Sequence, residues 1–183
     1  MLQYDVIVMG GGSAGYAAAR TASDMGASVA IVDKGPLGGL CILRGCMPSK
    51  TLLRSSDVMS LMKRAKEFGL RAQKLGVKMD EINDRKHALI KEFADYRAGQ
   101  LKNPKYNLIR GKGRFVDANT IAVRKKEYKA KSFILATGSV QAKVPVPGLE
   151  EAGYITSDEA LDARSLPKSM IVLGGGAVAT ELG

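Results

Sequence analysis

The chain has 183 residues, of which 45% are hydrophobic and 25% are charged. This length and balance fit one compact globular domain and the beginning of another, and they exclude a fibrous or largely disordered chain. No apolar run approaches the roughly 18 residues that a membrane span needs, and residues 1–5 lack a basic, signal-like start. We therefore expect a soluble, cytoplasmic protein with no membrane partner.

The formal net charge is +10, and the excess is concentrated in the middle of the chain. Residues 54–110 carry 14 basic and 7 acidic side chains, and residues 111–131 carry 7 and 2. These charges alternate with apolar residues at helical spacing, which is typical of a solvated helix face. Trp is absent and aromatic residues make up only 5%, so base-stacking surfaces are not expected. We favour a solvated surface over nucleic-acid binding.

The first elements predict a β-strand, a tight turn and a helix. Residues 4–9 form a short apolar run, residues 10–15 are rich in glycine, and an alanine-rich stretch extends to Met25. Residues 28–32 then form a second strand of the fully buried type, which ends at Asp33. Two strands joined by a helix are expected to lie parallel.

The next segments predict a loop followed by a helical hairpin. Residues 34–50 are rich in glycine and contain both cysteines, so we expect a loop there. Helical spacing of apolar residues follows, with a break expected near residues 69–77. The positions that show this spacing are Val58, Leu61, Met62, Ala65 and Phe68, and later Leu89, Phe93, Tyr96 and Leu101.

The rest of the chain predicts more β-structure and a linker. Residues 107–116, 120–123 and 127–130 are expected to form a small β-meander, and residues 131–136 a further strand. Prolines mark a linker at residues 140–169, within which residues 157–159 can start a short helix. Residues 170–173 predict a last apolar strand, which leads into a second glycine-rich segment.

The first glycine segment has the pattern G-x-G-x-x-G, at Gly10, Gly12 and Gly15. It follows a strand, opens a helix and is followed by Asp33 at the end of the next strand, which together indicate dinucleotide binding. Gly10 allows the tight turn, Gly12 lets the backbone approach a pyrophosphate, and Gly15 lets the helix pack on the strand. Asp33 can accept hydrogen bonds from a ribose. The alternative is a glycine-rich turn with no ligand.

Cys41 and Cys46 are separated by four residues. A disulfide can close this interval if the first cysteine lies in a loop and the second at a helix start, where the helix dipole also favours a thiolate. So small a loop gains little from a structural crosslink, so we favour a redox-active pair. Zinc is a second alternative, but the chain has one histidine, His87, far along a helical pattern. We expect no metal site, and we give His87 no catalytic role.

Residues 38–50, together with the first fingerprint and residues 136–139, resemble the class I pyridine nucleotide-disulfide oxidoreductases. That resemblance extends along nearly the whole chain. It implies an α/β fold: a Rossmann-like FAD-binding domain with a parallel sheet, a helical hairpin and a small β-meander, followed by the truncated start of a second nucleotide-binding domain. It implies FAD and NAD(P) as cofactors and an enzyme that passes electrons between NAD(P)H, FAD and a Cys41–Cys46 disulfide.

The resemblance also implies roles for single residues. Cys46 would be the charge-transfer thiol nearer the flavin, and Cys41 the interchange thiol that attacks a small-molecule or protein-bound disulfide substrate. Lys50 would lie beside the flavin ring and pair with Glu181, and Gly113 would contact the adenine through its backbone. The implied cofactor-binding positions are Gly10, Gly12, Ser13, Ala14, Gly15, Asp33, Lys34, Gly39, Leu40, Cys41, Cys46, Lys50, Gly113, Ala136, Thr137, Gly138 and Ser139 for FAD, and Gly174, Gly176 and Ala179 for NAD(P).

The chain departs from the family pattern in two places. Leu40 stands where the family usually has Thr, and Leu43-Arg44 stands where it usually has Asn-Val. Arg44 adds a cation that could favour a thiolate at either cysteine. Alternatively, its side chain points to solvent or binds a phosphate.

The expected domain organisation is an FAD-binding domain over residues 1–169 and the beginning of an NAD(P)-binding domain over residues 170–183. The full-length parent enzyme of this resemblance would be a homodimer. A different reading is a flavin- or dinucleotide-binding module without turnover, because the later domains of the family have no counterpart in these residues.

Overall fold

The computed structural model describes residues 2–183 and divides them into two compact units. The first unit contains the chain up to Leu43 together with Lys91–Gln141, and the second contains Arg44–Ile90 together with Ala142–Gly183. Over the described residues, the helices are all too short or too polar to cross a membrane.

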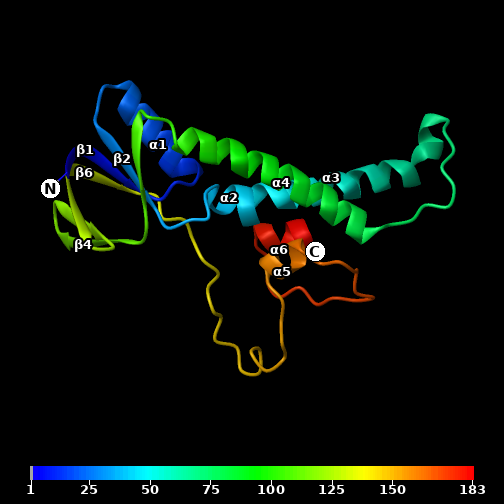
Figure 1. Cartoon of the computed structure of the whole chain (residues 1–183). Helices are drawn as coiled ribbons and strands as arrows, with labels where there is room; N and C mark the ends of the chain where they lie inside the picture. The colour runs from blue at the N-terminus through cyan, green and yellow to red at the C-terminus, as the bar shows by residue number, and fades with distance from the viewer. Residues whose placement is uncertain (1) are drawn as a thin grey trace. The chain divides into compact units, whose positions relative to one another are not determined.

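The first unit is built on a six-stranded sheet with the order β3-β2-β1-β6-β5-β4. Strands β1, β2, β4 and β6 of this sheet are labelled in Figure 1. The neighbours from β3 to β6 pair in parallel, and β6, β5 and β4 pair antiparallel. This confirms the α/β class and the parallel pairing of the first two strands. The strands are β1 (Leu2–Met9), β2 (Val29–Asp33), β3 (Tyr106–Arg110), β4 (Gly113–Asp117), β5 (Thr120–Val123) and β6 (Lys126–Leu135).

The β-meander differs from the prediction at both ends. Residues 107–116 form two strands rather than one, because the chain turns at Gly111, whose φ is +151°. Before this turn β3 pairs with β2, and after it β4 pairs with β5. Residues 127–130 and 131–136, predicted as separate strands, belong to the single strand β6. Their alternation continues without a turn residue, so nothing in the backbone interrupts the strand.

The two edges of this sheet lie close together in space. β3 and β4 are the opposite edge strands, yet only Gly111 and Lys112 connect them, and the three steps from Arg110 to Gly113 span about 11 Å at most. The sheet must therefore curl over itself. Gly113 at the start of β4 shows the closure, since a Cβ atom there would lie 2.8 Å from Cε of Met9 and 3.2 Å from Cγ1 of Val32.

Two hydrophobic clusters cover the two faces of the sheet, and both belong to the first unit. One lies inside the curl, where Ile121 and Tyr128 pack with Ile7. The other packs the opposite face against helix α1 (Ser13–Asp24) and against Leu101, the last residue of α4 (Met79–Leu101). Both faces of β1 and β2 are therefore buried, as the uninterrupted apolar runs of these strands predict.

The segment with the cysteines is more regular than the predicted loop. Residues 39–44 form a short helix, α2 (Gly39–Arg44), and helix α3 (Cys46–Lys63) follows after one residue. Gly38 and Gly39 both have positive φ, which ends the loop early and lets the helix begin. Both cysteines, expected in a loop, consequently lie on helices: Cys41 is within α2 and Cys46 is the first residue of α3.

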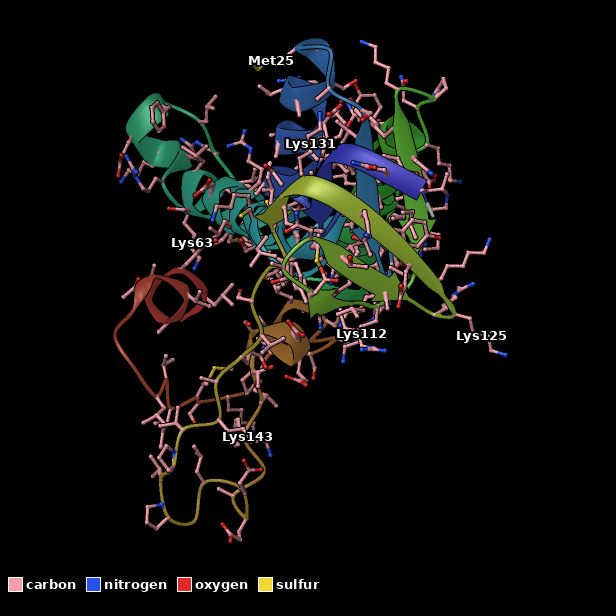
Figure 2. The ribbon with its side chains drawn as sticks, turned by 90° about the vertical axis from the view of Figure 1, so that its left-hand side faces the viewer. Met25, Lys63, Lys112, Lys125, Lys131 and Lys143 are labelled. Carbon is pink, nitrogen blue, oxygen red and sulfur yellow. The ribbon has the colours of Figure 1, made fainter. Side chains whose placement is uncertain are left out.

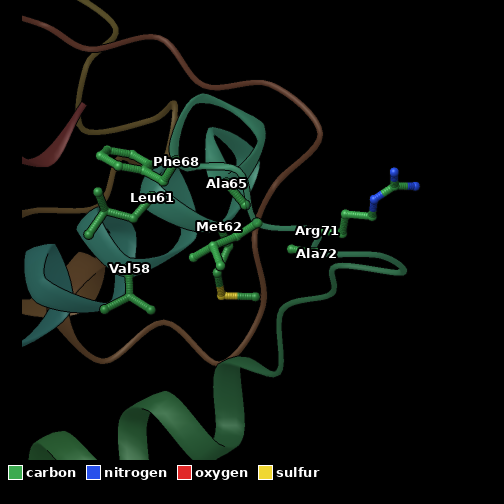
Figure 3. A pocket seen from close by; sticks show the side chains of 8 residues that line it. Val58, Leu61, Met62, Ala65, Phe68, Arg71 and Ala72 are labelled. Atoms are coloured by element: carbon green, nitrogen blue, oxygen red, sulfur yellow. The ribbon is translucent and has the colours of Figure 1, made fainter.

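The predicted helical hairpin is confirmed. It consists of α3, the short 3-10 helix η1 (Ala65–Phe68) and α4, with an irregular break at residues 69–78. Among the residues predicted to form its apolar face, Leu61 and Phe68 remain 47% and 59% exposed. They line an open apolar pocket of about 430 Å³ with Val58, Met62 and Ala65 (Figure 3).

The second unit also contains two short helices near the end of the chain, α5 (Ser157–Leu161) and α6 (Ala177–Leu182). The prediction of a short helix at residues 157–159 is confirmed. The predicted strand at residues 170–173 is wrong, because this segment has no regular structure and Ile171 is 95% exposed. A strand requires a neighbour for its backbone hydrogen bonds, and no strand of the described chain pairs with this one.

Candidate functional site

The first fingerprint forms a turn that only glycine can occupy. Gly10 has a φ of +112°, and a Cβ atom there would lie 2.1 Å from the carbonyl oxygen of Ala136. At Gly15, a Cβ atom would lie 1.8 Å from the carbonyl oxygen of Gly10. Neither position has room for a side chain. The predicted reasons for these two glycines, a tight turn and close packing of α1 on the strand, match this geometry.

Helix α1 begins at this turn with its backbone donors available for a ligand. Its N-cap is Gly12, which supplies no side-chain hydrogen bond, so the first N–H groups of the helix have no cap. A Cβ atom on Gly12 would meet only the Cα atom of Gly39, at 3.6 Å. Ser13 and Ala14 form the rest of the first turn. Uncapped donors at the positive end of a helix dipole fit a pyrophosphate, the group that joins the two halves of FAD.

Asp33 lies at the end of β2 beside this turn. One carboxylate oxygen accepts a hydrogen bond of 2.7 Å from the N–H of Gly11, and the other accepts one of 2.5 Å from the N–H of Gly35. A carboxylate has about four acceptor positions, so two remain for ribose hydroxyls. Lys34, which directly follows, is exposed. The arrangement fits the adenosine half of FAD.

Helix α2 begins against the same turn. A Cβ atom on Gly39 would lie only 2.4 Å from the Cα atom of Gly12, and Gly39 has a φ of +75°. The two backbones are therefore in direct contact. Leu40 and Cys41 follow within one turn of α2. The structure thus brings the first cysteine close to the candidate dinucleotide site.

The remaining predicted FAD positions of the first unit follow β6 or begin β4. Thr137, Gly138 and Ser139 form an irregular segment directly after β6, and Gly138 has a φ of +75°. Gly113 lies inside the curl of the sheet, where a side chain would collide with Met9. Its lack of a side chain is explained by this packing, and its contact with adenine stays a prediction.

In the second unit, Cys46 is the first residue of α3. The N-cap of this helix is Gly45, again without a side-chain hydrogen bond. The Cys46 residue is exposed, so the thiol lies at the positive end of an 18-residue helix within reach of solvent. Ser49, one turn later, donates a hydrogen bond of 3.3 Å to the carbonyl of Cys46.

Lys50 and Glu181, expected to pair, are in contact. The Nζ atom of Lys50 lies 2.7 Å from both carboxylate oxygens of Glu181. Hydrogen bonds from Lys50 and Ser49 lower the pKa of the Glu181 carboxyl. The structure therefore places the second glycine segment next to α3. What the pair does for a flavin stays a prediction.

The second fingerprint has the turn and the helix but not the strand. Gly174 has a φ of +118°, Gly176 is the N-cap of α6, and Ala179 lies within α6. No atom lies within 4 Å of a Cβ built on Gly174 or Gly176. The predicted NAD(P) contacts of these three residues are not tested by this arrangement.

Arg44 has a partner that the sequence did not indicate. Its Nη1 atom lies 2.9 Å from Oδ2 of Asp158, in the first turn of α5. Its side chain is 59% exposed. This largely exposed ion pair agrees with the alternative in which the Arg44 side chain points to solvent; an influence of Arg44 on either thiol stays a prediction.

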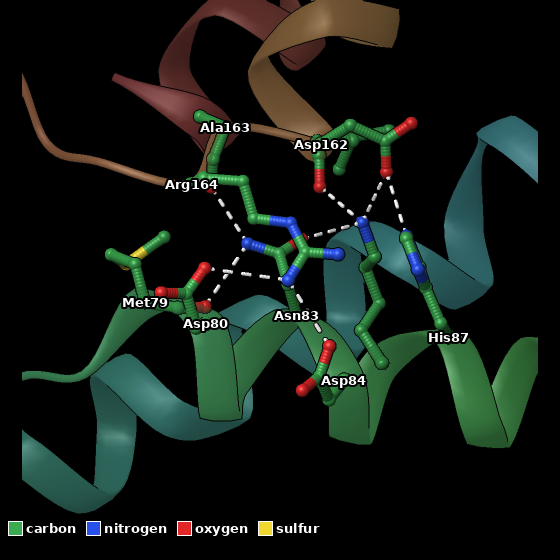
Figure 4. A network of polar contacts seen from close by, with 10 residues as sticks. Met79, Asp80, Asn83, Asp84, His87, Asp162, Ala163 and Arg164 are labelled. Carbon is green, nitrogen blue, oxygen red and sulfur yellow. Dashed lines mark hydrogen bonds and ion pairs between the residues drawn. The ribbon is translucent and has the colours of Figure 1, made fainter.

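The structure contains a polar cluster that sequence reasoning missed (Figure 4). Lys86 on α4 has only 2% of its surface exposed, and Asn83 is fully buried. Both bind the C-terminal end of α5 and the residues that follow it, through Leu161, Asp162 and Ala163. The sequence around Lys86, Asp-Arg-Lys-His, has the appearance of a solvated helix face, so no local signal could have revealed it.

His87, to which we gave no catalytic role, lies at the rim of the same cluster. Its Nε2 atom is 3.0 Å from Oδ1 of Asp162. Within residues 2–183, no three His, Cys, Asp or Glu side chains are grouped so that they could hold a metal ion.

The basic side chains are spread over several elements. Lys112 and Lys125, labelled in Figure 2, lie in the β3–β4 and β5–β6 connections, and Lys63 ends α3. Lys131 pairs with Asp5 at 2.7 Å, and Lys105 pairs with Asp24 at 3.1 Å. This distribution is typical of a solvated surface.

An α/β sheet with a glycine turn, an uncapped helix and an acidic residue at the end of the second strand defines a dinucleotide-binding protein. The sequence profile of the family "Pyridine nucleotide-disulphide oxidoreductase" matches residues 4–183, and the chain belongs to this family. Its members are oxidoreductases that use FAD and NAD(P)H.

Characterised relatives are similar along nearly the whole chain. A dihydrolipoyl dehydrogenase from Acholeplasma laidlawii is 36% identical over 98% of this chain and 55% of its own length. A mercuric reductase from Staphylococcus aureus is 35% identical over 98% of this chain and 33% of its own length. The chain thus spans between one third and about half of these relatives.

The fold is also that of a solved structure. The Cu(II) complex of RclA from Escherichia coli, an HOCl-induced flavoprotein disulfide reductase, superposes with a TM-score of 0.81 at 24% identity. The match covers 99% of this chain and 39% of that protein. At this identity the likeness concerns the fold.

Proposed function

We propose that the chain is the FAD-binding and dithiol-bearing part of an oxidoreductase that passes electrons between NAD(P)H, FAD and a Cys41–Cys46 disulfide. The observation that carries the proposal is the contact between Gly12 and Gly39. It places the helix that bears Cys41 directly on the turn that fits the pyrophosphate of FAD. Dihydrolipoamide dehydrogenase is the activity we favour, because it occurs among the relatives with the highest identity quoted above.

In this proposal the residues of the chain hold the cofactor and carry the exchange chemistry. The first turn of α1 binds the pyrophosphate, and Asp33 binds the ribose. FAD would supply a two-electron acceptor for the hydride of NAD(P)H. The geometry of the turn and the position of Asp33 support these two binding roles. Lys50, which pairs with Glu181, would present its ammonium group to the flavin, a role that the family resemblance implies.

The dithiol would act by thiol–disulfide exchange. The thiolate of Cys41 attacks one sulfur of the substrate disulfide, forms a mixed disulfide and releases the first substrate thiolate, which takes up a proton. The thiolate of Cys46 then attacks the sulfur of Cys41 and releases the second substrate thiolate. The Cys41–Cys46 disulfide formed in this way carries the two oxidising equivalents. A dihydrolipoamide dehydrogenase would run these steps in reverse.

For the domain organisation we propose an FAD-binding region over residues 1–169 and the start of an NAD(P)-binding region over residues 170–183. The exposure of Ile171 and Leu173 supports this boundary, since apolar residues of a buried-type strand need a sheet to cover them. We also propose that the full-length protein is a homodimer, the oligomeric state that the family resemblance implies.

A second candidate is a flavin- or dinucleotide-binding module without turnover. It is favoured by the second fingerprint, which has a turn and a helix but no strand to support a nucleotide. The two candidates differ in their response to NAD(P)H. A yellow protein whose flavin absorbance bleaches with NAD(P)H supports the enzyme, and a yellow protein that does not bleach supports the module.

The assignment of Cys46 has its own test. In the complete protein, two-electron reduction should produce a long-wavelength charge-transfer band, and Cys46→Ser should abolish it. Cys41→Ser, the matched control, should keep a thiolate next to the flavin and therefore keep the band. A band that persists in Cys46→Ser would refute the assignment. A colourless protein that does not take up added FAD would refute the proposed cofactor site.

A further inference from the structure

The buried ammonium group of Lys86 has three partners. Its Nζ atom donates to Oδ1 of Asn83 at 2.9 Å, to Oδ1 of Asp162 at 2.5 Å and to the carbonyl of Leu161 (Figure 4). A lysine ammonium has three donors, so all of them are satisfied, and Asp162 compensates the charge. A buried lysine is retained only under such conditions. We call Lys86, Asn83 and Asp162 the α4 clamp.

The α4 clamp forms hydrogen bonds with the backbone at the C-terminal end of α5. Lys86 binds the carbonyl of Leu161, the last residue of that helix, and Asn83 donates a hydrogen bond of 2.6 Å to the carbonyl of Ala163. The last carbonyls of a helix have no partner within it, so these side chains complete the helix end. The clamp thereby fixes α5 on a helix 75 residues earlier in the sequence.

The other end of α5 reaches Arg44. Thr156 caps the helix in a capping box with Glu159, and Asp158 in the first turn binds Arg44 at 2.9 Å. Five residues in α-helical form span about 7 Å. The α4 clamp and the Arg44–Asp158 ion pair therefore sit at opposite ends of a single rigid turn of helix.

Arg44 is separated from Cys46 by Gly45 alone, and Cys46 begins α3. An uncompensated guanidinium at this position would attract a thiolate at Cys46, whereas the pairing with Asp158 compensates its charge. We propose that Lys86 and Asp158 are positioning residues, which act through α5 and Arg44 to set the reactivity of the Cys46 thiol. The proposal rests on the proposed function only in its assumption that Cys46 works as a thiol.

The arrangement links two regions of the second unit that are remote in sequence. Residues 142–156, which precede α5, have no helix or strand. The α4 clamp holds residues 161–163 at the other end of α5, and Arg164 pairs with Asp80 and Asp84 on α4. A displacement of α5 would remove Asp158 from Arg44. A movement of residues 142–156 would in this way leave the positive charge of Arg44 uncompensated close to Cys46.

The test measures how fast iodoacetamide alkylates Cys46 in the reduced, full-length chain at pH 7, with each cysteine followed by mass spectrometry. Asp158→Asn should accelerate alkylation about two- to fivefold, as expected when one nearby charge loses its compensation in a solvent-like medium. Asp158→Glu should restore the original rate. The double variant Arg44→Met/Asp158→Asn should show no acceleration.

Lys86→Met should accelerate alkylation of Cys46 in the same way and also raise amide hydrogen exchange of residues 157–163 at least tenfold. The matched control is Lys91→Met, on the same helix, where the lysine forms an exposed ion pair with Asp95. It should change neither quantity. If Lys86→Met does not fold, Asp158→Asn and its Glu rescue decide the proposal.

Equal alkylation rates in the original chain and in Asp158→Asn would overturn the proposal, and so would an acceleration that survives in the double variant. Neither measurement requires flavin or NAD(P)H. A failure of the proposed function at the cofactor level would therefore leave these results unaffected, and the two failures can be distinguished.

Discussion

Lys50 donates hydrogen bonds of 2.7 Å to both carboxylate oxygens of Glu181, a residue 131 positions further along the chain. This pair, together with Ser49, lowers the pKa of Glu181. Because the folded-state pKa is lowered, the stabilisation is present above the ordinary pKa of glutamate, about 4.3. It is lost as the pH falls through the lowered value.

Lys50→Met should therefore raise the pKa of Glu181 towards its ordinary value. The chemical shift of the Glu181 carboxyl carbon, followed by NMR as a function of pH, reports this change of pKa directly. The titration is carried out at low ionic strength because salt screens an exposed ion pair. The control is Lys78→Met, which removes an exposed lysine paired with Glu81 at 2.7 Å. An unchanged titration of Glu181 in Lys50→Met would contradict the contact.

Asp5 should make a contribution to the stability of the first unit that is lost in acid. Its carboxylate accepts hydrogen bonds from Lys131 at 2.7 Å and from the Ser28 hydroxyl and N–H at 2.7 and 2.9 Å, which hold the pKa of Asp5 well below its usual range. The folded pKa is lowered, so this stability is present above the ordinary pKa of about 3.9 and is lost as the pH falls below it.

Asp5→Asn should reduce the loss of stability between pH 5 and pH 2. Urea unfolding midpoints at these two pH values measure it, and the difference between them should be smaller than in the unchanged chain. Asp24→Asn, which removes a carboxylate paired with Lys105, serves as the control. An equal reduction in both variants would show that only the net charge matters.

The glycines of the chain differ sharply in the space around them. A Cβ atom on Gly15 would lie 1.8 Å from the carbonyl oxygen of Gly10, whereas nothing lies within 4 Å of a Cβ on Gly99 in α4. Gly15→Ala should destabilise the chain by about 1–3 kcal/mol through overpacking and should weaken retention of FAD. Gly99→Ala should stabilise it by about 0.5–1 kcal/mol through helix propensity.

Urea unfolding followed by circular dichroism measures both changes, and flavin content per chain measures the effect on binding. Opposite signs are expected for the two alanine substitutions. Similar destabilisation by both would mean that the turn is not packed as described.

Thr156, the N-cap of α5, should contribute to the local stability of this helix. Its hydroxyl accepts a hydrogen bond from the N–H of Asp158, while Glu159 reaches back to the Thr156 backbone. Thr156→Ala should lower the stability of this helix by about 1 kcal/mol. Faster amide exchange confined to residues 157–162 is the expected result. Exchange that rises equally throughout the chain would instead indicate a global effect.

Local patterns predicted the parts of the fold that depend on neighbouring residues. The strand–turn–helix around Gly10 and the helical hairpin follow from spacing and glycine chemistry, and the structure confirms both. The division at Gly111 was missed because the chain crosses there from one sheet edge to the other. That crossing depends on how the sheet curls, which is a property of packing rather than of sequence spacing.

The candidate site shows the same limit. The cysteine motif identified the family from sequence alone, and the first fingerprint indicated its own geometry. The partners of Arg44 and Lys86 were not predictable, because Asp158 and Asp162 lie more than 70 residues away. The strand expected at residues 170–173 was wrong because strand propensity cannot provide a hydrogen-bonding neighbour.

The contact between Gly10 and Ala136 constrains how this protein can vary. β1 and β6 are parallel neighbours that end in register at Met9 and Leu135, so the two turns that follow leave the sheet side by side. A Cβ atom on Gly10 would collide with the Ala136 backbone. An insertion or a bulkier residue in one turn would therefore displace the other. The sequences of these two turns should therefore co-vary among homologous chains, although more than 120 residues separate them.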